Sequence, residues 1–176
     1  MTELKTLISE TDIQRRIREL AAEISRDYEG KSLTLVGVLK GAFIFLADLS
    51  RHLTMRRTIE FMAVSSYGVR TTHSGAVRVI MDLRQSIEGK HVLVVEDIVD
   101  TGLTLHYLLE LLQTREPASL KTCALVRKKD RHELDITVDY LGFDIPDVWI
   151  VGYGLDYAED FRALPYIGVL DPPPSA

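Results

Sequence analysis

The sequence contains a single cysteine, Cys123, among its 176 residues. One thiol excludes an internal disulfide framework and a zinc site built from several cysteines. Cys123 lies in the apolar stretch KTCALV, where the expected role is a buried strand thiol rather than a nucleophile. The N-terminus has no basic start followed by an apolar stretch, so we expect no signal peptide and a reducing, cytoplasmic location.

Positive charge and long apolar runs are also scarce. Lysine and arginine number 21 against 26 acids, so the net charge is −5 and we expect no nucleic-acid partner. The apolar run GAFIFLADL is too short to cross a membrane, and we expect no membrane partner either. The hydrophobic content of 46% and the charged content of 27% are those of an ordinary globular protein. A chain of this length fits one domain with a real core.

The sequence shows no internal repeat, no low-complexity linker, no Walker loop and no Gly-x-Gly-x-x-Gly motif after a strand. Hydrophobic periodicity predicts helices at 11–27 and 42–53, strands at 33–39, 58–67, 76–83, 119–126, 148–155 and 166–170, and a strand followed by a helix within 91–113. Thr11 and Gln14 suggest a capping box for the first helix, and Gly30 suggests its end. Alternating strands and helices favour an α/β domain around a mostly parallel sheet.

The stretch HVLVVEDIVDTGLTLHYLLELLQ, residues 91–113, combines a buried strand with an amphipathic helix. The turn at 100–104 should therefore lie at the carboxyl end of a parallel strand, where open α/β sheets bind ligands. The first N–H groups of a helix lack internal partners, and the helix dipole is positive there. Gly102 lets an anion come close, while Thr101 and Thr104 add hydroxyl donors. The turn suits a monophosphate.

Three acids surround this anion site and need another explanation. Glu96 and Asp97 would point to opposite faces of a regular strand, so both reach one ligand only where the chain leaves the sheet. Adjacent carboxylates suit a vicinal diol, and a diol beside a phosphate describes a ribose 5-phosphate. Asp100, a third carboxylate close to two others, is expected to have a raised pKa and to exchange a proton. The alternative is that Asp100 only caps the helix.

The stretch VLVVEDIVDTGLTL resembles the phosphoribosyl-diphosphate signature of the type I phosphoribosyltransferases. Four further stretches are similar to the hypoxanthine-guanine members in order and spacing: GVLKGAFIF, SSYG, GFDIPDVWIVGYGLDYAEDFR and LPYIGVL. The resemblance covers roughly residues 8–171. It implies an α/β fold with a mostly parallel central sheet flanked by helices, a small hood and a flexible loop. It also implies one domain over 1–176, with the hood formed by parts of the N- and C-terminal segments.

The resemblance assigns roles to individual residues. It gives the ribose and 5-phosphate to Glu96, Asp97, Asp100, Thr101, Gly102, Leu103 and Thr104. It gives pyrophosphate to Leu39, Lys40, Gly41 and Arg162, with a cis Leu39-Lys40 peptide, and the purine to Lys128, Trp149, Ile150 and Asp156. Ser66 and Tyr67 belong to the flexible loop, and Asp156, Glu96 and Asp97 are the candidate ligands of Mg²⁺.

Without the resemblance, several of these residues have ordinary interpretations. Lys40 reads as a surface lysine at a helix start, and Trp149 as a core side chain. Asp156 and Arg162 read as surface residues, and RKKDR as a solvated turn, an interpretation that Arg127, Lys129 and Arg131 keep.

The implied reaction is purine salvage: transfer of 5-phosphoribosyl from phosphoribosyl diphosphate to hypoxanthine or guanine, giving IMP or GMP and pyrophosphate. Asp100 would take the proton from N7 of the purine as N9 attacks, and Lys128 would donate to the 6-oxo group. The resemblance also implies a homodimer or homotetramer. One rival, a pyrimidine or other phosphoribosyltransferase, would lose Lys128 and Trp149. A regulator that binds phosphoribosyl diphosphate without catalysis would tend to lack Asp100, the loop or Arg162.

Overall fold

The computed structural model describes residues 4–66, 77–129 and 136–170. The helices are α1 (Glu10–Asp27), α2 (Phe43–His52) and α3 (Leu103–Gln113). The strands are β1 (Lys5–Ile8), β2 (Leu33–Leu39), β3 (Arg57–Ser66), β4 (Val77–Met81), β5 (His91–Val99), β6 (Ser119–Lys128), β7 (Tyr140–Ile145), β8 (Ile150–Val151) and β9 (Ile167–Val169).

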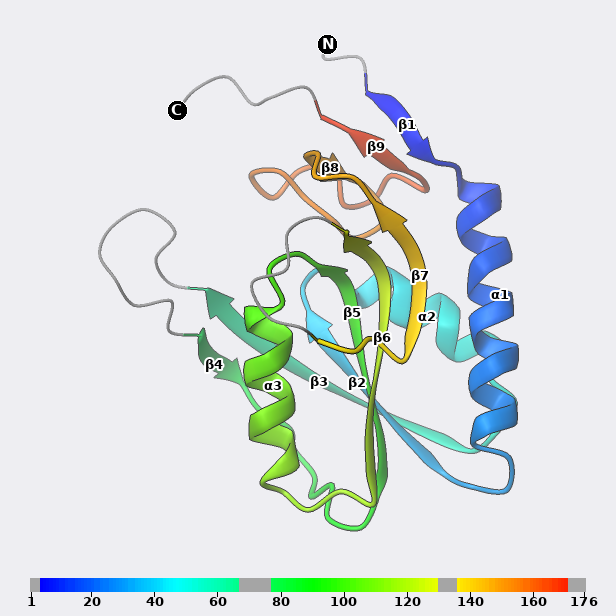
Figure 1. Ribbon diagram of the computed structural model, residues 1–176, viewed down its shortest axis with the longest axis vertical. Helices are drawn as coiled ribbons and strands as arrows, with labels where there is room; N and C mark the ends of the chain where they lie inside the picture. The colour runs from blue at the N-terminus through cyan, green and yellow to red at the C-terminus, as the bar shows by residue number, and fades with distance from the viewer. Residues whose placement is uncertain (1–3, 67–76, 130–135, 171–176) are drawn as a thin grey trace.

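Two sheets organise the described residues. The larger sheet has the order β4-β3-β2-β5-β6-β7 and is parallel except for β4, which pairs antiparallel with β3. The smaller sheet, of order β1-β9-β8, is antiparallel and joins the two ends of the chain. Figure 1 shows this smaller sheet above the carboxyl ends of the central parallel strands. We call the smaller sheet the hood; together, the two sheets confirm the predicted α/β architecture.

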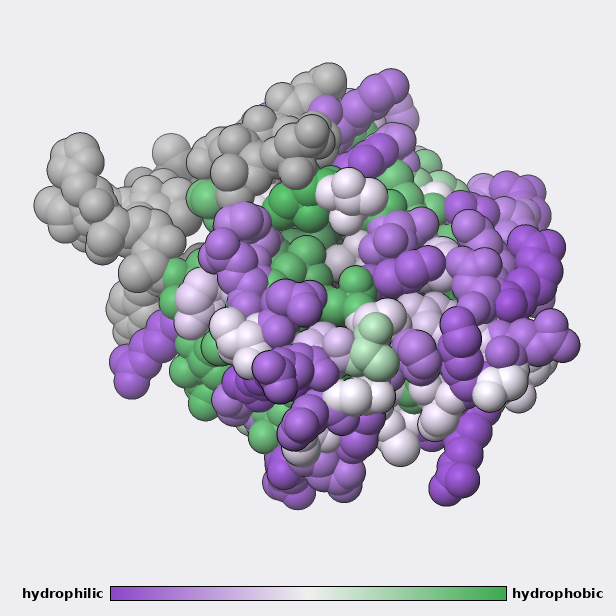
Figure 2. Space-filling view, turned by 60° about the horizontal axis from the view of Figure 1, so that its bottom comes forward, coloured by the Kyte–Doolittle hydropathy of each residue, from purple (hydrophilic) through white to green (hydrophobic). Residues whose placement is uncertain are grey.

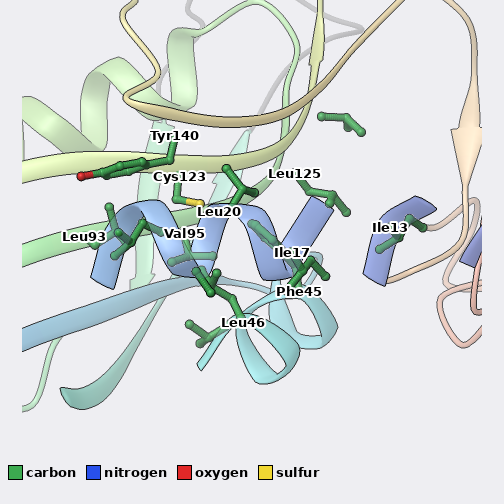
Figure 3. Packing of buried hydrophobic residues seen from close by; sticks show 14 of the residues in the cluster. Ile13, Ile17, Leu20, Phe45, Leu46, Leu93, Val95, Cys123, Leu125 and Tyr140 are labelled. Carbon is green, nitrogen blue, oxygen red and sulfur yellow. The ribbon is translucent and has the colours of Figure 1, made fainter. Parts of the chain in front are cut away.

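Helices cover both faces of the central sheet, because its inner strands are apolar on both sides. On one face, α1 and α2 pack through residues such as Ile13, Ile17 and Phe45 against side chains of β5, β6 and β7 (Figure 3). On the other face, α3 places Leu105, Leu108 and Leu112 against the opposite sides of the same strands. Figure 2 shows that mostly hydrophilic side chains cover the end away from the hood.

Several boundaries differ from the sequence prediction. The cap of α1 is Ser9, whose side chain accepts from the N–H of Asp12, so the Thr11 capping box is wrong. The predicted strand 148–155 shrinks to β8, because Gly152, Tyr153 and Gly154 have φ of 100°, 51° and 99° and turn the chain out of an extended path. Strands β1 and β7 were not predicted. The predicted polar hairpin GVRTTHSG and the tail DPPPSA lie outside the described residues.

The charged segment after β6 also begins later than predicted. Arg127 and Lys128 belong to the strand rather than to a solvated turn. Arg127 lies opposite Asp144 of β7, and its Nε and Nη2 donate to the carboxylate at 2.7 and 3.1 Å. Strand alternation then directs Lys128 to the opposite side, where its side chain is buried.

Candidate active site

A cavity opens where β5 separates from β2. Pairing between these strands ends at Val95 opposite Gly37, whereas β5 continues beside β6 to Val99. The cavity, of about 230 Å³, lies at the carboxyl ends of the strands, where α/β sheets bind ligands. It is lined by Val38, Leu39, Gly41, Val64, Glu96, Asp97, Ile98, Val99, Asp100, Thr101, Gly102, Thr104 and Leu105. The sequence-predicted diol and phosphate residues therefore share one cavity, except Leu103, whose side chain is exposed.

The turns at Gly41 and Gly154 and the carboxylate of Asp97 meet at one edge of the cavity, where neither glycine position has room for a side chain. A Cβ added to Gly41 would lie 1.7 Å from Oδ2 of Asp97, and one added to Gly154 would lie 2.0 Å from the carbonyl oxygen of Gly41. The Leu39-Lys40 peptide just before this contact is cis, as the resemblance implied. The two glycines thus let the β2 turn pass between β5 and the segment after β8.

The two adjacent acids are held in a poorly solvated environment. Glu96 is only 6% exposed, and burial followed by repulsion from Asp97 raises its pKa well above the ordinary value. Burial also raises the pKa of Asp97, from 3.8 to about 6, although hydrogen bonds from the N–H groups of Asp97 and Ile98 and the charge of Arg162 oppose the rise. A ligand that donates hydrogen bonds or carries positive charge would therefore stabilise the ionised form of both acids.

The start of α3 leaves its backbone donors available. The cap residue is Gly102, in the left-handed region at φ 88°, and no side chain caps the helix. Asp100 is therefore not the N-cap, and the alternative interpretation of this residue is wrong. The N–H of Leu103 lies 3.4 Å from Oγ1 of Thr101, a long contact. A helix N-terminus of this kind, with no acid in its first turn, attracts an anion.

On the β6 side of the cavity, the ammonium group of Lys128 lies near both Asp100, in the turn before α3, and Trp149, the residue before β8. Its Nζ lies 3.7 Å from Oδ2 of Asp100 and 3.0 Å from Oδ1 of Asp147. The same Nζ lies 6.0 Å from the ring centroid of Trp149. Trp149 is 59% exposed, so its interpretation as a core side chain is wrong and its ring face is open to a flat ligand. Ile150 follows it in β8 and is buried.

A second group of charges surrounds the turn after β2. Arg162 donates from Nη1 to the carbonyl oxygen of Gly154 at 2.7 Å, and its Nη2 lies 2.9 Å from Oδ1 of Asp156. Its Nε is buried and has no hydrogen-bond partner within the described part of the chain. The side chain of Glu159 lies 2.8 Å from Nζ of Lys40 and 3.5 Å from Nη2 of Arg162. The fold thus brings Lys40, Asp156 and Arg162 together at this turn.

The sequence analysis missed a buried network that anchors the segment after β8. Asp48 of α2 accepts from the hydroxyl of Tyr153, from Arg51, and from Nε2 of Gln14 at 2.8 Å. Burial and then the hydrogen bond to Asp48 raise the pKa of Tyr153, which keeps its hydroxyl protonated as a donor. The feature of the sequence that could have revealed this network is Asp48, an acidic residue within the apolar run that forms α2. The network fixes Gly154, and with it the segment that carries Asp156 and Arg162.

Two predicted residues lie at the limit of what the structure describes. Ser66 is the last residue of β3 and pairs with Val77, whereas Tyr67 and the predicted flexible loop lie outside the described residues. Among the described helices, none is long and apolar enough to cross a membrane.

The fold and the site define a phosphoribosyltransferase, and the phosphoribosyl transferase domain family matches residues 6–158. The chain is 52% identical over 170 residues to the hypoxanthine-guanine phosphoribosyltransferase of Dictyostelium discoideum, covering 94% of each chain. It is 49% identical to that of Bacillus subtilis strain 168, covering 96% of this chain and 93% of the relative. The chain belongs to the hypoxanthine-guanine phosphoribosyltransferase family.

Solved structures agree with this assignment. A hypoxanthine-guanine phosphoribosyltransferase from Bacillus anthracis, crystallised with a HEPES molecule in its active site, superposes with a TM-score of 0.92 at 48% identity and covers 96% of this chain and 100% of that one. A ternary substrates complex of a variant hypoxanthine phosphoribosyltransferase from Trypanosoma cruzi gives 0.90 at 47% identity, covering 96% and 95%.

The contact between Gly154 and Gly41 can be tested by substitution. We expect Gly154→Ala to lower the free energy of unfolding by about 2–4 kcal/mol, because a left-handed backbone and a steric clash both oppose the new Cβ. Gly30→Ala is the matched control, since Gly30 has a φ of 72° but no heavy atom within 4 Å of the position that its new methyl group would take. It should cost about 1 kcal/mol. Urea denaturation measures both, and equal costs would contradict the proposed close contact.

The raised pKa of Asp97 predicts a pH dependence of stability. A carboxyl that titrates near 6 when folded and near 3.8 when unfolded stabilises the fold below pH 4, and this contribution is lost as the pH rises through 6. Relative to Asp97→Asn, the wild-type protein should therefore lose up to about 3 kcal/mol between pH 4 and 7, the equivalent of roughly two pKa units. Denaturation without Mg²⁺ measures this difference. The exposed control Glu88→Gln should follow the wild type, and a pH-independent difference for Asp97→Asn would refute the assignment.

Proposed function

We propose that the protein salvages purines through the cavity between β2, β5 and α3. The activity is that of a hypoxanthine-guanine phosphoribosyltransferase: phosphoribosyl diphosphate and a 6-oxopurine give a nucleoside monophosphate and pyrophosphate. The observation that carries the assignment of roles is the position of Asp100. Its carboxylate lies between the anion-binding turn and Lys128, 3.7 Å from the ammonium group.

In this proposal the ribose 5-phosphate lies across the mouth of the cavity. The N–H groups at the start of α3 and the hydroxyls of Thr101 and Thr104 bind the phosphate, and the carboxylates of Glu96 and Asp97 accept from the ribose diol. Gly102 keeps the turn open, and Leu103 contributes its backbone N–H rather than its side chain.

The purine would lie between Trp149 and Lys128. The ring of Trp149 stacks on the base, Ile150 offers backbone groups to its edge, and Asp156 lies beside it. Lys128 donates to the 6-oxo group, which favours a carbonyl oxygen over the amino group of adenine, because an unsatisfied buried donor is costly. Asp147, 3.0 Å from Nζ, supports the lysine in this orientation. The base then has N7 near Asp100, which accepts the proton as N9 attacks C1 of the ribose.

Breaking the bond between C1 and the pyrophosphate oxygen leaves positive charge on the ribose and negative charge on the leaving group. The backbone of Leu39, Lys40 and Gly41 would receive that leaving group together with Arg162. The buried Nε of Arg162, which has no partner among the described residues, supports this role, because a buried cationic donor needs an acceptor. Ser66 and Tyr67 complete the proposal as part of a loop that excludes water.

Mg²⁺ is the proposed cofactor, and the residues at this place fit it. Asp156, Glu96 and Asp97 offer oxygen donors, which Mg²⁺ prefers, and the raised pKa of Asp97 marks a carboxylate whose charge a cation would compensate. Among the described residues, no group of three or more acidic, histidine or cysteine side chains is arranged around a metal position. The proposed site is of another kind, with one or two carboxylates plus substrate oxygens and water. When bound, Mg²⁺ neutralises charge on the pyrophosphate.

A single domain over 1–176 and a cytoplasmic location belong to the same proposal. The hood packs on the central sheet through Ile8, Ile150 and Ile167, which share one hydrophobic cluster with α1 and α2. The one thiol, Cys123, is buried and suits a reducing compartment.

The direct test is an assay of nucleotide formation. Purified protein, phosphoribosyl diphosphate and Mg²⁺ are incubated with hypoxanthine, guanine, xanthine, adenine or uracil in turn. We expect a nucleotide from hypoxanthine or guanine and none from uracil. A nucleotide from uracil alone would favour the pyrimidine alternative, and binding of phosphoribosyl diphosphate without any product would favour a regulator.

The role of Asp100 predicts a specific kinetic change. Asp100→Asn should lower kcat for IMP synthesis at least about tenfold, because general acid–base groups contribute this much or more. The KM for phosphoribosyl diphosphate should change little, since the phosphate and diol contacts remain. Asp147→Asn is the matched variant: it removes the other acid beside Lys128 and should act mainly on the KM of the purine. Unchanged turnover in Asp100→Asn would exclude the proton-acceptor role.

We further propose that the protein forms a homodimer or homotetramer. Phe43, Ile59 and Phe61 are 44%, 45% and 38% exposed and lie around one hollow between α2 and β3, a surface suited to a second subunit. Ile59→Asp should shift the mass measured by sedimentation equilibrium toward the monomer. Ile80→Asp, at an exposed apolar position outside the hollow, is the control. An unchanged mass for Ile59→Asp would remove this surface from the interface.

A further inference from the structure

The side chain of Glu159 lies between two cations that come from different parts of the chain. Its Oε2 is 2.8 Å from Nζ of Lys40, which follows β2, and its Oε1 is 3.5 Å from Nη2 of Arg162. One carboxylate therefore bridges two cations: Arg162, to which the proposed function gives pyrophosphate, and the ammonium group of Lys40, whose backbone belongs to the proposed pyrophosphate turn. Neither the proposed mechanism nor any of the sequence motifs assigns a role to Glu159.

The backbone around Glu159 is built to present this side chain. Ala158 and Glu159 both have positive φ, at 51° and 68°, which non-glycine residues adopt only occasionally. Tyr157 and Asp160 close the turn with N–H···O bonds of 3.2 and 3.0 Å, and the N–H of Glu159 donates to Oδ2 of Asp156 at 2.9 Å. The turn thereby ties Glu159 to Asp156, which also contacts Arg162.

The contacts of Glu159 are of a kind that a stronger anion can replace. The side chains of Lys40 and Glu159 are 67% and 66% exposed, and exposed ion pairs are weak because water and salt screen them. The hydrogen bond from Lys40, together with its charge, lowers the pKa of Glu159, which keeps the carboxylate ionised near neutral pH. A pyrophosphate carries several negative charges and more acceptor oxygens than one carboxylate, so it would displace Glu159 from both cations.

We propose that Glu159 acts as an internal anion that binds Lys40 and Arg162 when pyrophosphate is not bound, and that competes with pyrophosphate for them. This inference rests on the proposed function, which gives pyrophosphate to Arg162 and to the backbone of the turn that carries Lys40; the ammonium group of Lys40 is a further contact added by the inference. Glu159 is a positioning residue: it holds the Lys40 ammonium group and the Arg162 guanidinium group beside the turn after β2. When pyrophosphate leaves, Glu159 binds Lys40 and Arg162 again and compensates their positive charge. This competition weakens pyrophosphate binding and speeds its release.

The test is a titration of pyrophosphate in excess Mg²⁺ into wild-type protein, Glu159→Gln and Asp160→Asn. Asp160→Asn is the matched control, because it removes the same charge one residue away, where the side chain accepts from the N–H of Phe161. Thermal melts confirm that each variant folds. We expect Glu159→Gln to bind pyrophosphate about 3- to 10-fold more tightly than Asp160→Asn, a coupling of the size found for contacting charges.

A double-mutant cycle separates competition from a general field effect. In a Lys40→Gln background, the difference in pyrophosphate affinity between Glu159→Gln and Asp160→Asn should shrink by at least half. One of the two cations for which Glu159 and pyrophosphate compete is then absent. In stopped-flow displacement, pyrophosphate should leave Glu159→Gln more slowly than the wild type.

Two results would overturn the inference. Equal pyrophosphate affinities for Glu159→Gln and Asp160→Asn, in a preparation that forms IMP from hypoxanthine, would reject the competition while leaving the proposed function intact. A wild-type protein that neither binds pyrophosphate nor forms a nucleotide would reject both.

Discussion

The close contact of Gly154, Gly41 and the Asp97 carboxylate holds together three segments that are remote in the sequence. No Cβ fits at either glycine, so the turn after β2 can approach both the Asp97 side chain at the end of β5 and the segment after β8 only because Gly41 and Gly154 lack side chains. Each segment supplies a different part of the proposed site: the pyrophosphate turn, the acid pair, and Asp156 with Arg162. The buried Tyr153–Asp48 contact fixes the third segment against α2. The arrangement of the segments around the cavity therefore depends on packing contacts that lie outside it.

The distribution of charge follows from where each segment meets solvent. Glu96 and Asp97 lie deep in the cleft and have raised pKa values, so the protein alone does not fully stabilise their charge. Lys128 is also buried, but it is accompanied by two acids, Asp100 and Asp147. Lys40 and Glu159 form their pair in water, where it is weak. In the proposed function, the deep acids bind a cation or diol that remains throughout the reaction, while the outer cations bind a product that must leave.

Local chemistry explains which parts of the fold were predictable. The apolar run at 92–95 and the regularly spaced leucines of α3 specify their elements through burial alone, and both were found. Strand β7 was missed because YLGFDI is neither alternating nor continuously apolar, and it is recognisable as a strand only beside β6. The strand predicted at 148–155 was too long because φ at Gly152 and Gly154 depends on tertiary contacts, which apolar composition does not reveal.

The candidate site shows the same limit. Some of its residues are recognisable from the local sequence pattern, whereas others are placed only by contacts with distant segments. Residues 100–104 were predicted as an anion site because a strand–turn–helix junction presents unpaired N–H groups and the positive end of the helix dipole. Arg162 and Asp156 have no such local signal: they come near Asp97 because positive φ at several nearby positions, among them Tyr153 and Phe161, folds the segment back on the β2 turn. Glu159 belongs to this second class. Its bond to Lys40 spans 119 residues and follows only once the Gly41–Gly154 contact has brought the two turns together. The glycines that leave room for backbone contact thus also decide which charges meet.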